Sequence, residues 1–221
     1  MTRPTPARQE QRLQTRAKLV EAALRIFAER GYDHSTVEEI SLAAGHSKGA
    51  YYFHFDSKED IFLELLQTWI DDQTNRLRAF ETASGPAAIA LMDALESVLR
   101  YDDRDPLWRL LLPEIWAQSH RNARVREMLR SAYTRWIALI QGIFEKADRE
   151  GLISLAVRSD LAASLVLAAH DGLILRSRLR VPSEVEVSTS RIVAGLVSVL
   201  APSQQTPALS PTPRRTARRK R

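Results

Sequence analysis

A short run of residues near position 50 combines small side chains, a cation and polar aromatic groups. Residues 47–55 read Ser-Lys-Gly-Ala-Tyr-Tyr-Phe-His-Phe. Small groups at the start of a helix let backbone N–H groups and the Lys48 ammonium approach a phosphate closely. Glycine inside a helix costs about 1 kcal/mol relative to alanine, so Gly49 indicates that something must come close to this backbone. Tyr52 and His54 add polar tips, and the run therefore indicates contact with a nucleic acid.

The elements around this run must hold it at a fixed angle. A helix is predicted over residues 36–43, and Gly45 can supply the positive φ of a tight turn before a second helix over 47–53. The first helix opens with a hydroxyl residue and an acid three positions apart, a capping pattern present twice, at Ser35 with Glu38 and at Thr36 with Glu39. Two helices joined by a short glycine turn are typical of the helix-turn-helix, whose second helix enters the major groove.

The segment TVEEISLAAGHSKGAYYFHFDSKEDIFLEL, residues 36–65, resembles the N-terminal signature of the TetR family of transcriptional regulators. The shared features are an opening threonine, an Ala-Gly turn, Ser-Lys-Gly, an aromatic-His-Phe run and a lysine followed by an acid. The resemblance implies DNA contacts from seven positions, Thr36, Ser47, Lys48, Gly49, Tyr52, His54 and Lys58. It also implies a homodimer that reads an inverted repeat and releases it on binding a small molecule. Three further aromatic residues are expected to pack in the core, Tyr51, Phe53 and Phe55.

Apolar residues at steps of three and four recur along the chain, which is typical of amphipathic helices. We expect an all-α protein of about nine helices. An N-terminal three-helix, homeodomain-like helix-turn-helix domain would precede a C-terminal helical domain for ligand binding and dimerisation. Beyond 36–43 and 47–53, the expected helices span residues 13–30, 57–80, 86–101, the segment after Pro106 to 119, 121–150, 159–179 and 183–201.

Breaks in this pattern divide the chain into four parts. Residues 1–12 are polar and contain Pro4 and Pro6, so they are expected to form a flexible arm. The helix-turn-helix domain is expected over 13–60, and the ligand-binding and dimerisation domain over 61–202. Residues 203–221 are rich in proline and cations, which predicts a disordered basic tail.

Aromatic residues are concentrated in the helices expected after position 57. Three of the four tryptophans lie within residues 108–136, on helices that surround an inner pocket in the layout that the resemblance implies. Core packing and ligand binding both fit such residues, and each indole N–H needs a partner if it is buried. The pocket candidates are Phe62, Trp69, Trp108, Trp116, His120, Tyr133, Trp136 and His170. A cationic ligand boxed by aromatic rings would fit if Glu114 or Asp171 faced this cavity.

Small and apolar residues on the last two expected helices predict a dimer interface. Small residues let helices approach closely, and in a two-fold dimer the same surface meets its own copy. Packing within one chain is the alternative, but reading a half-site with one short helix requires a second copy. The interface candidates are Ala168, Gly172, Ile192, Gly195, Leu196 and Val199.

The charge of the chain is unevenly distributed. The formal net charge is +5, but six cations lie in residues 214–221, so the remainder carries −1. Residues 15–60 contain six cations and eight acids. Phosphate neutralisation usually dominates DNA affinity, so we expect binding to depend on the local placement of Lys48, Lys58 and helix N-termini, with a modest salt dependence. The expected arm adds three further cations, Arg3, Arg8 and Arg12.

Several classes of protein have no support in the sequence. The chain has no cysteine, which excludes disulfides and thiolate chemistry. The five histidines show no metal-ligand spacing, and no phosphate loop or catalytic constellation is present, so no metal, no cofactor and no enzymatic activity are expected. No apolar stretch predicts a membrane span, and a cytoplasmic location is expected. The expected partners are double-stranded DNA, a small-molecule effector and a second copy of the chain.

Two other functions fit the same features. The first is a DNA-binding protein with a filled core that responds to no ligand. The second is a small-molecule-binding protein in which the 47–53 helix is purely structural. Stabilisation by a ligand would exclude the first, and loss of DNA binding in Lys48 and Tyr52 variants would exclude the second.

Overall fold

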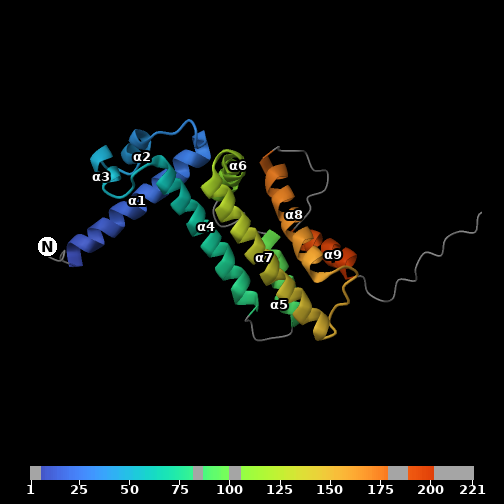
Figure 1. Cartoon of the computed structure of the whole chain (residues 1–221). Helices are drawn as coiled ribbons and strands as arrows, with labels where there is room; N and C mark the ends of the chain where they lie inside the picture. The colour runs from blue at the N-terminus through green and yellow to red at the C-terminus, as the bar shows by residue number, and fades with distance from the viewer. Residues whose placement is uncertain (1–5, 82–86, 100–105, 179–188, 202–221) are drawn as a thin grey trace, which may run out of the picture.

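The computed structural model describes residues 6–81, 87–99, 106–178 and 189–201, and every regular element in these ranges is an α-helix. The basic tail expected over 203–221 and the expected start of the last helix at 183 lie outside the described residues. The elements, shown in Figure 1, are α1 (Pro6–Arg30), α2 (Val37–Ala43), α3 (Lys48–Tyr52), α4 (Lys58–Glu81), α5 (Ala87–Leu99), α6 (Pro106–Arg121), α7 (Ala123–Arg149), α8 (Ser159–Arg178) and α9 (Thr189–Leu200).

The first helix begins at Pro6, about two turns earlier than predicted, so the prediction of an arm over 1–12 was wrong for residues 6–12. Proline fits the first position of a helix because its fixed φ is already helical and no hydrogen bond needs its missing N–H. The residues that follow, Ala-Arg-Gln-Glu-Gln-Arg, all favour helix. Their polarity, which suggested an arm, instead reflects a helix whose sides are exposed.

Helices α1 to α3 form the helix-turn-helix around buried residues that include Phe27, Ile40 and Tyr51. Thr36 caps α2 through a full capping box with Glu39, while Gly45 has a φ of 72° in the turn before α3. The buried Tyr51 hydroxyl donates to the Ser57 carbonyl oxygen at 2.9 Å and so ties α3 to the start of α4. These contacts fix the angle of α3 against the domain.

Two of the three aromatic core predictions in this region are confirmed. Tyr51 and Phe55 are buried, but Phe53 is 63% exposed. Tyr51 and Phe55 are four residues apart and share the inner face, with ring centroids 5.6 Å apart. Phe53, two residues after Tyr51, faces outward for that reason, and the Arg12 guanidinium carbon lies 4.9 Å from its ring centroid.

The remaining helices form a bundle in which α4 connects the two halves of the chain (Figure 1). Helix α7 packs against α4 and α8, and α5 packs against α4, α7, α8 and α9. Buried residues of α7 recur at helical spacing from Val125 to Ala147, so this helix forms the centre of the bundle. Among the described residues, no helix is both long enough and apolar enough to cross a membrane.

Candidate nucleic-acid interface and effector cavity

Helix α3 presents its small and polar residues to solvent. Ser47 caps the helix by accepting a hydrogen bond from the Ala50 N–H at 3.2 Å. Tyr52 is 47% exposed, and Gly49 is also exposed. A Cβ added at Gly49 would meet only the Ser47 hydroxyl, at an ordinary 3.7 Å. The fold itself therefore does not require a glycine here, which leaves close approach by an external molecule as the reason for one.

Lys48 forms an ion pair with Glu38 of α2 on the open surface. The hydrogen bond between them raises the pKa of Lys48 and lowers that of Glu38. Exposed pairs of this kind contribute little to stability, because water screens the attraction and two long side chains must be ordered. The ammonium can therefore exchange this carboxylate for a phosphate at low cost.

Thr36 and Lys58 are engaged inside the domain. The Thr36 N–H donates to Glu39 Oε2 at 2.9 Å, and the Thr36 hydroxyl accepts from the Glu39 N–H at 3.2 Å. Lys58 Nζ donates to the carbonyl oxygens of Tyr32 at 2.7 Å and Ser35 at 2.8 Å. The ammonium also lies 4.3 Å from the centroid of the Tyr32 ring. The Thr36 cap follows the predicted capping pattern, whereas the sequence pattern did not indicate that Lys58 holds the loop between α1 and α2.

His54 lies directly after α3, close to two cations of α1. Burial is the main cause that lowers the pKa of His54, and the nearby guanidinium groups of Arg12 and Arg16 lower it further. The imidazole is therefore neutral at pH 7 and can donate one hydrogen bond.

The second site is a small cavity in the bundle, bounded by α4, α5, α7 and α8. Its volume is about 20 Å³, which is enough for a single water molecule. Three pocket candidates line it, Trp69, Trp136 and His170. The Trp69 and Trp136 rings meet edge to face with centroids 5.2 Å apart, and Trp136 Nε1 donates to the Thr74 hydroxyl at 3.0 Å.

Polar residues that sequence reasoning missed also line this cavity, namely Gln73, Arg76 and Ser97. Gln73 Nε2 is inaccessible to solvent and has no hydrogen-bond partner among the described residues. Residues 73 and 76 lie one and two turns beyond Trp69, so helical spacing from that tryptophan could have identified them. A buried donor without a partner is costly, and a ligand acceptor would remove this cost.

A chain of hydrogen bonds lies beside the cavity and joins three helices. The Tyr133 hydroxyl of α7 donates to Asp171 Oδ2 of α8 at 2.9 Å and is hydrogen-bonded to Trp116 of α6. Burial, followed by the Asp171 charge, raises the pKa of Tyr133 well above its usual value. Asp171 also lies 3.2 Å from His170 Nδ1. Asp171 itself does not line the cavity, but it contacts His170, which does.

Three pocket candidates lie away from this cavity. Phe62 packs between Phe27 and Tyr32 in the junction with the helix-turn-helix, with centroids at 5.6 and 4.7 Å. It lies only one turn into α4, which is too close to the DNA-binding domain to reach the bundle centre. His120 is exposed at the end of α6, and Trp108 is half-buried against the core.

The two halves of the chain meet at the turn between α6 and α7. Arg121 Nη1 and Gln118 Nε2 of α6 lie 2.9 and 3.3 Å from the carboxylate of Asp33, which follows α1. Asn122 Nδ2 donates to Glu59 Oε1, in the first turn of α4, at 3.0 Å. These contacts connect α6 to the loop that precedes α2.

Helix α8 carries an exposed apolar stripe along its length. The stripe consists of Leu161, Leu165, Ala168, Gly172 and Leu175. Steps of four and three repeat every seven residues, which is the spacing of a seam that packs against another helix. Two dimer candidates, Ala168 and Gly172, belong to the stripe, and sequence reasoning missed its three leucines.

The dimer candidates on α9 divide into two pairs. Gly195 and Val199 are exposed, whereas Ile192 and Leu196 are half-buried and pack against the core. A Cβ at Gly172 or at Gly195 would meet nothing within 4 Å. Packing within this chain therefore does not require a glycine at either position.

The chain matches two family models that together span most of its length. Residues 19–65 match "Bacterial regulatory proteins, tetR family", and residues 87–200 match "BetI-type transcriptional repressor, C-terminal". The repressor AcnR of Corynebacterium efficiens is 30% identical over 198 residues, covering 89% of this chain and 87% of AcnR.

Two solved structures share the fold. Salmonella enterica GusR is 28% identical with a TM-score of 0.65, over 90% of this chain and 98% of GusR. A transcriptional regulator from Saccharomonospora viridis, solved in complex with choline, is 24% identical with a TM-score of 0.70, over 82% and 92% of the two chains. With an exposed α3 braced by a capped α2, a long α4 and a helical C-terminal half, this chain belongs to the TetR family of helix-turn-helix transcriptional regulators.

Proposed function

We propose that this protein is a ligand-responsive repressor, and that a homodimer holds an inverted-repeat operator until a small molecule binds. The observation that carries the proposal is helix α3, whose exposed face gathers Lys48, Gly49 and Tyr52 on a tightly braced helix. Two such helices would read half-sites roughly 34–36 Å apart, or somewhat more. Ser47 and His54 would bind backbone phosphates, as would Lys58 and the Thr36 end of α2.

The exposed stripe of α8, together with Gly195 and Val199 of α9, supports dimerisation through these two helices. An apolar stripe of this length would be unfavourable in water on a monomer. Two copies related by a two-fold axis would cover it with the same residues of the partner. Sedimentation at micromolar concentration tests this assignment, and a Leu165→Asp variant should shift the protein to a monomer.

The aromatic residues around Asp171 support a cationic organic effector. Quaternary ammonium groups bind where aromatic faces surround them and a carboxylate balances their charge. A neighbour of the same fold, the regulator from Saccharomonospora viridis, was solved in complex with choline, a compound of this class. The present cavity holds about one water, so binding must separate α4 and α7 around Trp69 and Trp136. We propose that this opening stabilises the state with weak DNA affinity.

The effector class can be tested with a matched pair of compounds. Choline should raise the melting temperature of the protein, whereas its neutral carbon isostere 3,3-dimethylbutanol should not. Asp171→Asn should abolish the effect of choline. Equal stabilisation by both compounds would overturn the cationic class and leave an apolar ligand.

Movement of α6 provides the route from the cavity to DNA. Trp116 lies half a turn before Gln118, so a ligand that breaks the Trp116–Tyr133 hydrogen bond would displace the residues that bind Asp33. A ligand can shift the equilibrium only by its differential affinity for the two states, typically about 1–3 kcal/mol.

The decisive experiment for the function is selection of DNA from a random pool by the purified protein, repeated with Lys48→Ala. An inverted repeat that the variant loses would establish sequence-specific reading by a dimer. Recovery of no motif would overturn the proposal.

A second function, constitutive DNA binding without an effector, is favoured by one observation, the small volume of the bundle cavity. A thermal-shift screen separates the two functions. Stabilisation by any compound, coupled to loss of operator binding, excludes constitutive binding.

A further inference from the structure

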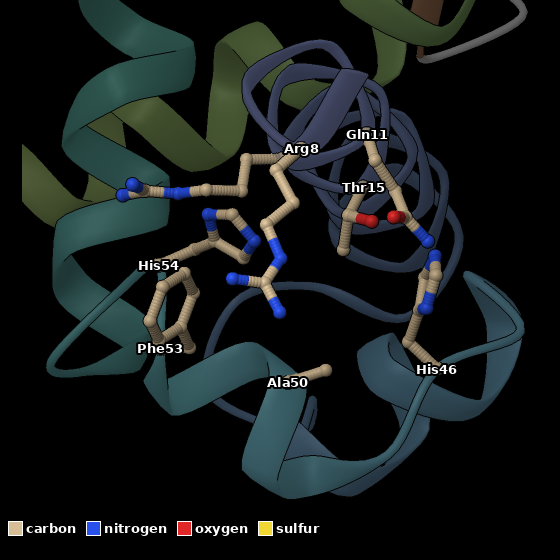
Figure 2. Close-up of a pocket in the computed structure, with 8 residues that line it drawn as sticks. Arg8, Gln11, Thr15, His46, Ala50, Phe53 and His54 are labelled. Atoms are coloured by element: carbon tan, nitrogen blue, oxygen red, sulfur yellow. The ribbon is translucent and has the colours of Figure 1, made fainter. Parts of the chain in front are cut away.

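A groove separates the N-terminal half of α1 from α3, and it exists because α1 extends back to Pro6 (Figure 2). Its volume is about 560 Å³. One wall is a single face of α1, formed by Arg8, Gln11, Arg12 and Thr15 at helical spacing. The other wall consists of His46, Ala50, Phe53 and His54, from the turn before α3, from α3 itself and from the residues directly after it.

The groove is lined by cations without counterions. No carboxylate lines it, and neither Arg8 nor Arg12 forms an ion pair with any described residue. By contrast, Arg16, one turn further along α1, pairs with Glu64 of α4. The two guanidinium groups therefore leave a local positive potential in a domain whose residues 15–60 carry more acids than cations.

A hydrogen-bonding group in the groove also lacks a partner. His46 Nε2 is inaccessible to solvent and makes no hydrogen bond among the described residues. Figure 2 shows the His46 ring facing the end of Gln11 across the groove. An imidazole nitrogen, an amide and a hydroxyl near two guanidinium groups form a donor set suited to an anion with several oxygens.

From this arrangement we infer that the groove between α1 and α3 is a phosphate-binding site, and that the phosphate belongs to the DNA backbone beside the major groove read by α3. This rests on the proposed function. The groove is continuous with α3 because Ala50, Phe53 and His54 belong to its wall. A DNA strand that runs along the exposed face of α3 would therefore enter the groove directly.

The site also accounts for how a domain with so few unpaired cations binds DNA. Arg8 and Arg12 would supply charge neutralisation that residues 15–60 lack, and bidentate guanidinium contacts would fix the register of α3 on the duplex. The exposed Phe53 ring keeps the Arg12 guanidinium in place by stacking below it. The affinity for DNA of any sequence would therefore depend on α1, whereas the discrimination between DNA sequences would depend on α3.

The test uses the full chain and an operator obtained by selection. The double variant Arg8→Gln/Arg12→Gln is compared with Arg25→Gln, which removes an exposed arginine further along α1. In the double variant, the slope of log affinity against log salt concentration should become shallower by about 2 to 4 for the dimer. This range assumes a change of about 1 for each phosphate that is no longer neutralised. Affinity should fall at least tenfold, equally for specific and random DNA, while Arg25→Gln changes neither.

Operators with a single neutral methylphosphonate identify the source of the phosphate. At one or two positions per half-site the replacement should weaken binding of the wild-type protein at least fivefold, and it should have no effect on the double variant. A free phosphorylated molecule as the natural ligand would give a different result. In that case inorganic phosphate, added at constant ionic strength, would compete with DNA for the wild-type protein but not for the double variant. No single methylphosphonate in the operator would then weaken binding. These two results together would overturn the inference.

The outcome separates this inference from the proposed function. If selection yields an inverted repeat but the double variant binds it with unchanged affinity and salt slope, the groove is not a phosphate site and the function stands. If no DNA is selected, the proposed function fails first. Far-UV circular dichroism of the double variant excludes loss of the α1 extension as the cause of weakened binding.

Discussion

The N-terminal and C-terminal halves of this protein use aromatic residues in opposite ways. Around α3, Phe53 and Tyr52 are exposed beside arginine and lysine side chains. In the bundle, Trp69 and Trp136 are buried edge to face, and the cavity between them holds about one water. The proposed DNA-binding surface is therefore already exposed in the free protein, whereas the proposed effector site would have to be opened by its ligand. Under that proposal, part of the effector's binding energy would be used to change the structure, and DNA binding would not require such a change.

The largest expected effect is on the free energy of unfolding, and it differs between the two halves of the chain. Trp136→Ala should lower the free energy of unfolding by about 3–5 kcal/mol, because it removes a large buried side chain and leaves the Thr74 hydroxyl without its donor. Leu42→Ala, at a residue that is 81% exposed, should change it by less than about 0.5 kcal/mol. Denaturant titrations at one protein concentration measure both values. A loss below about 1 kcal/mol in Trp136→Ala would mean that the cavity region is already loosely packed.

The next effect concerns DNA affinity without a change in stability. Lys48→Ala should weaken operator binding at least about tenfold, or about 1.4 kcal/mol, because a cation on the reading face is removed. Its ion pair with Glu38 is exposed, so unfolding should not change measurably. Lys18→Ala, an exposed lysine on α1, is the matched control and should retain full affinity. An equal loss in both variants would show that only net charge matters.

A smaller effect is expected at Gly49, where one substitution should change stability and DNA affinity in opposite directions. Gly49→Ala should stabilise the fold by up to about 1 kcal/mol, because the added methyl group meets only an ordinary contact and alanine favours helix. The same methyl group should weaken DNA binding by preventing close approach of the backbone. Thermal unfolding and fluorescence anisotropy measure the two sides. A variant that is more stable and binds DNA as tightly would remove the functional reason for this glycine.

The smallest effect is the pH dependence of stability. The pKa of His54 is lowered in the folded protein, so the unfolded chain binds its proton more tightly. Stability is therefore full above the ordinary histidine pKa and decreases as the pH falls through the folded value. His54→Gln should flatten the profile below about pH 6.5. A profile that is the same in the wild-type protein and in His54→Gln would show that His54 is not its source.

Local patterns predicted the helix-turn-helix well, because caps and turns depend on a few adjacent residues. Thr36 with Glu39 and Gly45 define their helix ends as expected. The start of α1 was predicted wrongly because its residues are polar on all sides, and periodicity gives no signal there. The sequence could not predict which residues line the cavity, because Trp69 and His170 come from helices that are far apart in the chain and meet only in the fold. The hydrogen bonds of Lys58 to the carbonyl oxygens of Tyr32 and Ser35 depend on a loop that only the fold brings to it.

The ion pair between Lys48 and Glu38 has a consequence for the affinity for DNA. If Lys48 binds a phosphate as proposed, the Glu38 carboxylate occupies the place of that phosphate in the free protein, and any duplex must displace it. Because the pair is exposed and screened by water, this cost is small, and it applies to the operator and to random DNA alike. The pair therefore lowers the affinity for all sequences by a similar small factor and leaves the ratio between operator and random DNA unchanged. Glu38→Gln should bind the operator and random DNA more tightly by the same factor.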